Sequence, residues 1–109
     1  MTSENSNGPT RAMVKSYEDF LQDELRDPEL AAAYLTAALE GSQEEFLLAL
    51  RSVADAHGGL AAVAEATQLN RQTLYRTLSG QGNPTLATLQ GVLRAVGLTL
   101  AFAPAASAP

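Results

Sequence analysis

The sequence predicts an all-α fold of five helices, with one extra helix on the N-terminal side and a short β-strand on the C-terminal side. Three observations support this fold class. Apolar residues recur at the three- and four-residue spacing of helices, a polar capping residue precedes most apolar runs, and glycine follows most of them. The 109 residues are enough for one compact domain with a modest core.

The first two predicted helices lie in the front third of the chain. Ser16 can cap a short helix over residues 17–25. Asp27 is the expected N-cap of the second helix, and Pro28 stands at its first position, where a missing N–H costs nothing. Gly41 is expected to end this helix.

The third predicted helix begins with a capping box. Ser42 and Glu45 form the S-x-x-E pattern directly before an apolar run, so the helix is expected to continue to about Ala56. Gly58 and Gly59 follow and are expected to stop it.

Three further helices and a strand are predicted beyond these glycines. A short helix covers residues 60–66, and Asn70 caps the next one over residues 71–78. Thr85 caps the last helix, and Gly97 lies beyond its end.

The sequence LTLAF then alternates Leu98, Leu100 and Phe102, which predicts one strand. A lone strand cannot satisfy its own backbone groups. We therefore expect it to pair with a second copy, with a partner's sheet or with another part of this chain, the second copy being preferred.

The polar, low-complexity ends are predicted to be disordered tails. The expected organisation is a tail over 1–15, a single helical domain over 16–103 (N-terminal helices 16–41, helix-turn-helix core 42–97, strand 98–103), and a tail over 104–109.

Charge is divided sharply along the chain. The net charge is −5, yet every acidic residue lies at or before Glu65, and only Arg71, Arg76 and Arg94 carry charge after it. This split indicates two different partners. The chain has no cysteine, which excludes disulfides and thiol chemistry, and no long apolar run, so a cytoplasmic protein without a membrane span is expected.

Residues 60–80 follow the order of a helix-turn-helix motif. A small-residue helix comes first, then a tight turn at residues 67–69, then a helix with a polar cap. Val63, Leu69 and Leu74 are expected to pack between the two helices. Gln68 occupies the turn position that often carries glycine, and it enters the left-handed region only at some cost.

Removing the apolar positions leaves one outer face on the second helix of this motif. Arginine suits guanine and glutamine suits adenine, each through two hydrogen bonds in the major groove. The same pattern also fits a plain solvated surface. The motif spacing and the absence of acids in the sequence after Glu65 favour DNA. The candidate DNA-binding residues are Asn70, Arg71, Gln72, Tyr75 and Arg76.

Three stretches carry a family resemblance: LRDPELAAAYLTAALE, LNRQTLYRTLS and GNPTLATL. Through them the chain resembles the probable addiction module antidote proteins, which are HigA-like antitoxins in the lambda-repressor-like (XRE) helix-turn-helix group. The resemblance covers about residues 17–103. It implies a type II toxin–antitoxin system, repression of the protein's own operon, and a partner toxin of the RelE/HigB-like ribonuclease kind.

The resemblance also implies roles for the candidate residues. Arg71, Gln72 and Arg76 are the implied base readers, and Asn70 and Tyr75 are the implied contacts to the DNA backbone. The acidic front, residues 17–45, is expected to contact the basic face of the toxin.

The predicted function is therefore that of a homodimeric antitoxin and transcriptional repressor, which binds double-stranded operator DNA and needs no enzyme activity, cofactor, metal or membrane. Two alternatives stay open. One is a stand-alone XRE-type transcriptional regulator, which the neighbouring gene would distinguish. The other is a helical protein-interaction module without DNA binding, which a gel shift on its own promoter would distinguish.

Overall fold

The computed structural model describes residues 17–105, and within this range the chain is all-helical. The tail predicted over residues 1–15 lies outside the described residues, as does the tail predicted over 104–109 from residue 106 on. Residues 17–26 are helical. The helices that follow are α2 (Pro28–Leu39), α3 (Gln43–Ala56), α4 (Gly59–Thr67), α5 (Arg71–Thr77) and α6 (Leu86–Ala95). The predicted all-α class is confirmed.

Four helices, α2, α3, α5 and α6, start at the polar residues that the sequence marks as caps, and each of these caps makes its hydrogen bond. α4 follows Gly58, which has no side chain to cap it, and the predicted cap Ser16 lies outside the described residues. The Ser42 hydroxyl accepts from the Glu45 N–H, while the Glu45 carboxylate accepts from the Ser42 N–H, so the capping box is complete. The other cap side chains that accept a backbone N–H at their helix start are Asp27, Asn70 and Thr85.

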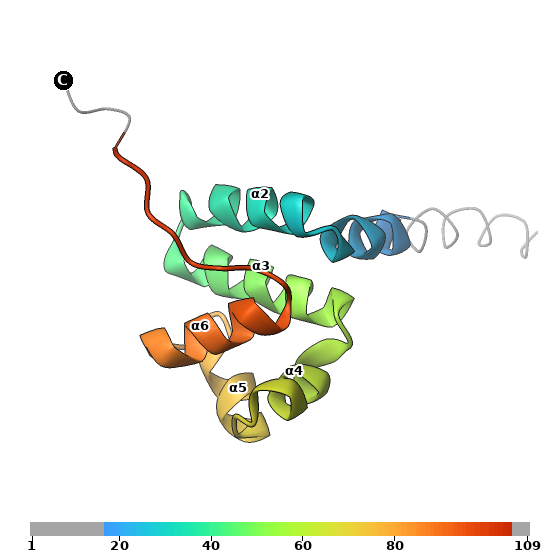
Figure 1. Cartoon of the computed structure of the whole chain (residues 1–109), viewed down its shortest axis with the longest axis vertical. Helices are drawn as coiled ribbons and strands as arrows, with labels where there is room; N and C mark the ends of the chain where they lie inside the picture. Colours follow the sequence, from blue (N-terminus) through green and yellow to red (C-terminus); the bar gives the residue numbers. More distant parts are fainter. Residues whose placement is uncertain (1–16, 106–109) are drawn as a thin grey trace, which may run out of the picture.

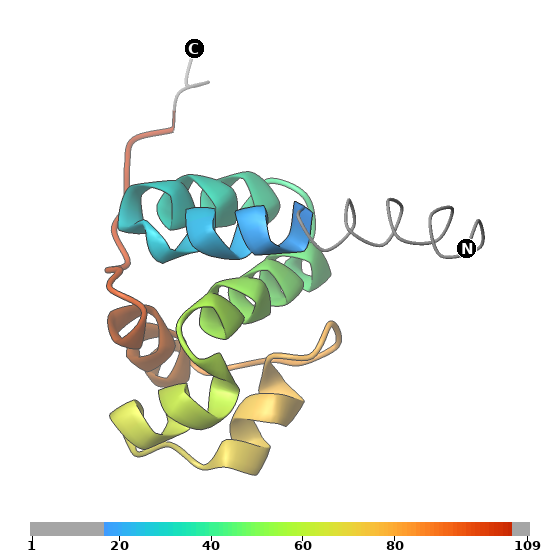
Figure 2. The ribbon, with the colours of Figure 1, turned by 90° about the vertical axis from the view of Figure 1, so that its right-hand side faces the viewer.

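The helices are arranged around α3. α2 packs against α3, α3 against α4, and α4 against both α5 and α6. Both views place α2 at one end of the molecule and α4 with α5 at the other (Figures 1 and 2). Leu50, Val53 and Ala54 of α3 are completely buried, as expected of a helix covered on two sides.

The front helices share this core. Leu25, Ala31 and Leu35 are buried together with the side chains of α3 to α6. Removing residues 17–41 would therefore expose apolar surface on α3. The front of the chain is structurally part of the domain, and its function is best tested by point substitution.

The predicted strand over residues 98–103 does not form in the single chain. Residues 98–105 follow α6 without regular secondary structure. α6 ends in a Schellman motif, in which Gly97 has a φ of +85° and the Leu98 N–H donates to the Leu93 carbonyl at 2.8 Å. The alternating side chains of residues 98–102 suit one strand of a pair, but no other described segment lies beside them as the second strand.

Among residues 17–105 no single helix is long and apolar enough to cross a membrane. α3 and α4 reach the necessary length and apolarity only together, across a bend of 86°.

The loop between α5 and α6 depends on one glycine, and this yields a stability prediction. A methyl group on Gly82 would overlap the backbone carbonyl of Thr77, whereas one on Gly91 in α6 would make an ordinary 3.5 Å contact with Leu69. We expect Gly82→Ala to lower the free energy of unfolding by about 1–3 kcal/mol, as other steric overlaps do.

Gly91→Ala is the matched control. It should leave stability unchanged or raise it by up to about 1 kcal/mol, because alanine favours a helix interior over glycine. Urea unfolding followed by circular dichroism measures both variants. Equal stability of Gly82→Ala and the parent chain would contradict the loop geometry.

Candidate nucleic-acid interface

The turn between α4 and α5 is held by local hydrogen bonds. The Thr67 hydroxyl donates to the Val63 carbonyl at 2.7 Å and accepts from the Leu69 N–H at 3.3 Å. Gln68 has a φ of +60°, and within the described part of the chain it is the only residue other than glycine with a positive φ. Glutamine therefore adopts the left-handed conformation at the turn position that often carries glycine, at the steric cost expected for an L-residue.

Apolar side chains anchor the turn and α5 to the rest of the domain. Val63 and Leu74 are buried, and Leu69 is half-buried against the core. Leu69 lies over Gly91 of α6, close enough that a methyl group on Gly91 would touch it. The predicted core roles of these three side chains are confirmed. Their packing fixes how far α5 projects from the domain.

The outer face of α5 is solvent-exposed. Leu74 and the C-cap residue Leu78 have no exposed surface and mark the inner face of this seven-residue helix and its end. All five predicted site residues are exposed: Asn70, Arg71, Gln72, Tyr75 and Arg76. The structure thus brings the predicted residues together on one short helix and its cap.

Asn70 is the N-cap of α5. Its side-chain oxygen accepts the Thr73 N–H at 2.9 Å. The NH₂ group of the same amide is a donor that the cap does not use. Asn70 can therefore cap the helix and donate to an anionic group at the same time.

Arg51 of α3 is a cation near this face that the sequence pattern did not reveal. Its guanidinium carbon lies 5.1 Å from the centre of the Tyr75 ring, within the range of a cation–π contact. The contact holds the tyrosine ring next to α3 and adds a positive charge beside α5. No local pattern links the two residues, because they come from different helices.

The structure also places one acid close to the loop that follows α5. A methyl group on Gly80 would lie 3.1 Å from the carboxylate of Glu44, at the start of α3. The neighbouring Gln43 side chain donates to the Gly82 carbonyl at 3.2 Å. The linear charge pattern suggested that acids are absent from this neighbourhood. That inference is wrong here, because the first turn of α3 packs beside the loop.

Within residues 17–105 no group of three histidine, aspartate or glutamate side chains could hold an ion. The chemistry that the exposed face of α5 offers is hydrogen-bond donation and positive charge.

Comparison with known proteins places the chain in a family. The family described as "Probable addiction module antidote protein" matches residues 15–104. The chain belongs to this family of addiction module antidotes. It is also 34% identical over 88 residues to a protein of Haemophilus influenzae described as uncharacterized, a match that covers 79% of this chain and 90% of that protein. No solved structure matches the chain.

Family membership gives the antidote a coarse function. An addiction module antidote acts as the antitoxin to a toxin, so membership indicates an antitoxin role and implies a cognate toxin as partner.

The Arg51–Tyr75 contact can be tested by a double-mutant cycle. We expect Arg51→Gln and Tyr75→Leu to couple by about 0.5–1 kcal/mol in the free energy of unfolding, the size of an exposed cation–π pair. At high salt this coupling free energy should fall less than the coupling free energy between Arg26 and Asp23, which form an exposed ion pair. Additive effects of the two substitutions would show that the contact contributes nothing.

Proposed function

We propose that this antidote is the antitoxin of a type II toxin–antitoxin system, which represses its own operon by binding operator DNA and neutralises a RelE/HigB-like toxin. In this proposal α4, its turn and α5 act as a lambda-repressor-like (XRE) helix-turn-helix, with α5 as the recognition helix. The observation that supports it best is the outer face of α5, where Arg71, Gln72 and Arg76 are exposed on a helix anchored by buried Leu74.

The residue types on this face suit base reading. The major groove is about 12 Å wide and admits an α-helix, whose first turn then faces the base edges. Arg71 and Gln72 stand in that first turn. An arginine can donate twice to guanine, and a glutamine can pair twice with adenine.

The neighbouring side chains suit backbone contact. Asn70 retains an amide donor beyond its cap bond. Arg51, held over Tyr75, adds a cation at the edge of the face. Contacts of this kind set the position of a protein on DNA without reading sequence.

The proposed toxin site is on residues 17–45, chiefly on the helices that precede α3, and these helices lie at the end of the molecule away from α5 (Figure 2). Residues 17–30 carry six acidic side chains and only one basic one: Glu18, Asp19, Asp23, Glu24, Asp27 and Glu29 against Arg26. Tyr17 and Phe20 are 67% and 61% exposed among these acids.

Exposed aromatic side chains surrounded by charge are typical of interface anchors. A ribonuclease that binds RNA needs a basic surface, so its charge would complement this end. Because the helices that precede α3 lie apart from α5, the proposal allows DNA and toxin to be bound together.

The DNA proposal is tested by single substitutions on α5. Arg71→Ala and Gln72→Ala should each lower operator affinity by about 1–3 kcal/mol and relax the preference at one base pair. Arg26→Ala removes the same charge as Arg71→Ala from the distant front helix and should leave affinity nearly unchanged. Electrophoretic mobility shifts with promoter DNA at fixed salt measure all three. If both α5 variants bind with parental affinity and selectivity, α5 is not the recognition helix.

The toxin proposal is tested in the full-length chain, because Leu25, Ala31 and Leu35 make truncation disruptive. Tyr17→Ser with Phe20→Ser should weaken toxin binding by at least about tenfold, the loss expected for anchor residues, and should leave operator binding intact. Leu86→Ser, equally exposed on α6, is the control and should bind toxin normally. If the double variant fully rescues the growth of cells that produce the toxin, the toxin binds elsewhere on the antidote.

A further inference from the structure

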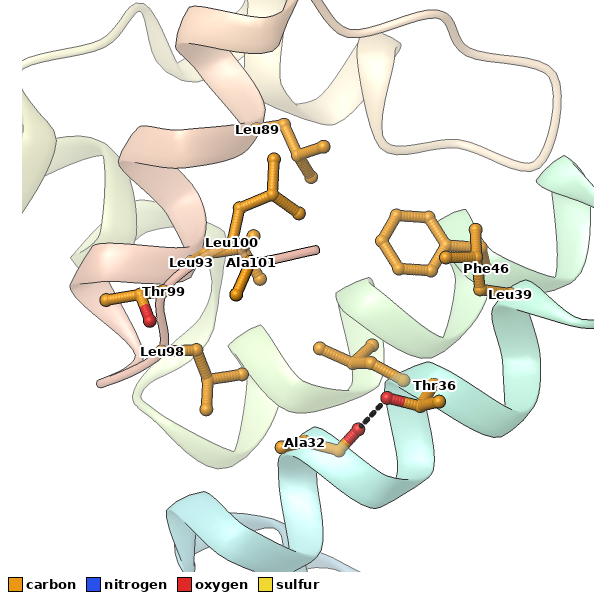
Figure 3. A pocket seen from close by; sticks show the side chains of 11 residues that line it. Ala32, Thr36, Leu39, Phe46, Leu89, Leu93, Leu98, Thr99, Leu100 and Ala101 are labelled. Atoms are coloured by element: carbon orange, nitrogen blue, oxygen red, sulfur yellow. Dashed lines mark hydrogen bonds between the residues drawn. The ribbon is translucent and has the colours of Figure 1, made fainter. Parts of the chain in front are cut away.

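An apolar groove separates α2 from α6. Its α2 wall belongs to residues 17–45, but the groove contains none of the acidic side chains of residues 17–30 and no residue of α5. Its volume is about 340 Å³, and every residue that lines it is uncharged. In Figure 3 Leu89 of α6 faces Phe46 of α3 across the hollow, and Leu39 of α2 lies beside Phe46. For comparison, an apolar cavity of about 150 Å³ is enough to bind benzene. The groove therefore has room for an aromatic side chain.

The chain after α6 forms one wall of this groove. Residues 98–101 line it, and both ribbon views show this segment leaving α6 and passing α2 (Figures 1 and 2). The Leu98 N–H makes the last backbone hydrogen bond of α6. Among the described residues, none of the backbone groups of residues 99–105 makes a backbone–backbone hydrogen bond. Leu100 is 40% exposed and Phe102 is 94% exposed. An extended segment with open backbone groups and alternating apolar side chains is an unpaired strand edge.

We propose that a second copy of this chain covers the groove. The two copies are related by a two-fold axis, their 98–102 segments pair as antiparallel strands, and Phe102 of each copy enters the groove of the other. A surface that carries both a projecting aromatic ring and a groove large enough to hold one is complementary to a second copy of itself. Such self-complementarity is the requirement for an isologous dimer. Pairing supplies the missing backbone partners, and the exchange of Phe102 buries the most exposed large apolar side chain of the described residues.

Charge favours a second copy over other occupants. After Arg94 the sequence contains no charged residue, so two copies bring two neutral surfaces together. Charge does not steer a basic toxin to this neutral groove, whereas the acidic front helices attract it. The inference rests on the proposed function only in that a two-fold dimer matches a palindromic operator.

The first experiment measures the dimer of the full-length protein by sedimentation equilibrium. Phe102→Ser and Leu39→Ser, one on each side of the contact, should each raise the dimer dissociation constant by at least about tenfold. Phe20→Ser is the matched control, the same change at an exposed site on the front helix, and should leave it unchanged. Because all three side chains are largely exposed, circular dichroism should show parental folding. A monomeric parent, or a dimer insensitive to both groove variants, overturns the inference.

The second experiment uses the absence of cysteine from the sequence. Phe102→Cys protein mixed with Leu39→Cys protein should form a disulfide-linked heterodimer on oxidation, whereas Phe102→Cys mixed with Leu30→Cys should not. Equal cross-linking to Leu30→Cys overturns the inference. A parent that is dimeric through this groove yet fails to bind operator would count against the α5 assignment alone.

Discussion

The burial of α3 between α2 and α4 is the contact on which the rest of the molecule depends. Its side chains Leu50 and Val53 have no exposed surface, because one side of the helix meets α2 and another meets α4. Packing at native density resists relative movement of the helices it joins. The acidic front helices and the exposed face of α5 are therefore held at opposite ends of one core. Removing the front helices would expose α3, and removing α5 would expose α4.

This arrangement is consistent with an antidote that acts by binding. The proposed DNA face consists of donors and cations on a short helix that is too small to be stable alone and depends on Leu74 and Leu69 for its position. The proposed toxin face consists of acids and exposed aromatic rings. The neutral groove between α2 and α6 is distinct from both in chemistry, which is why a third contact, with a second copy, is assigned to it.

Much of the fold could be predicted from the sequence because its signals are local. Asp27, Ser42, Asn70 and Thr85 mark helix starts through bonds to residues two or three positions away, and the spacing of leucines separates the inner from the outer face of each helix. The five candidate residues on α5 followed from the same periodicity.

Features that depend on distant contacts escaped prediction. The stacking of Arg51 on Tyr75 and the approach of Glu44 to Gly80 join α3 to α5 and its loop, and nothing in the local sequence encodes them. The C-terminal alternation predicted a strand, yet pairing needs a neighbour that the single chain does not supply.

The central claim, that one end of the domain binds DNA and the other binds the toxin, can be tested by backbone amide NMR of the full-length protein. Operator DNA and purified toxin would be added separately and then together. The account predicts that DNA shifts the amide resonances of residues 70–77, that toxin shifts those of residues 17–39, and that both sets shift when both ligands are present. Competition between the ligands, or a DNA-induced shift confined to the front helices, would contradict it.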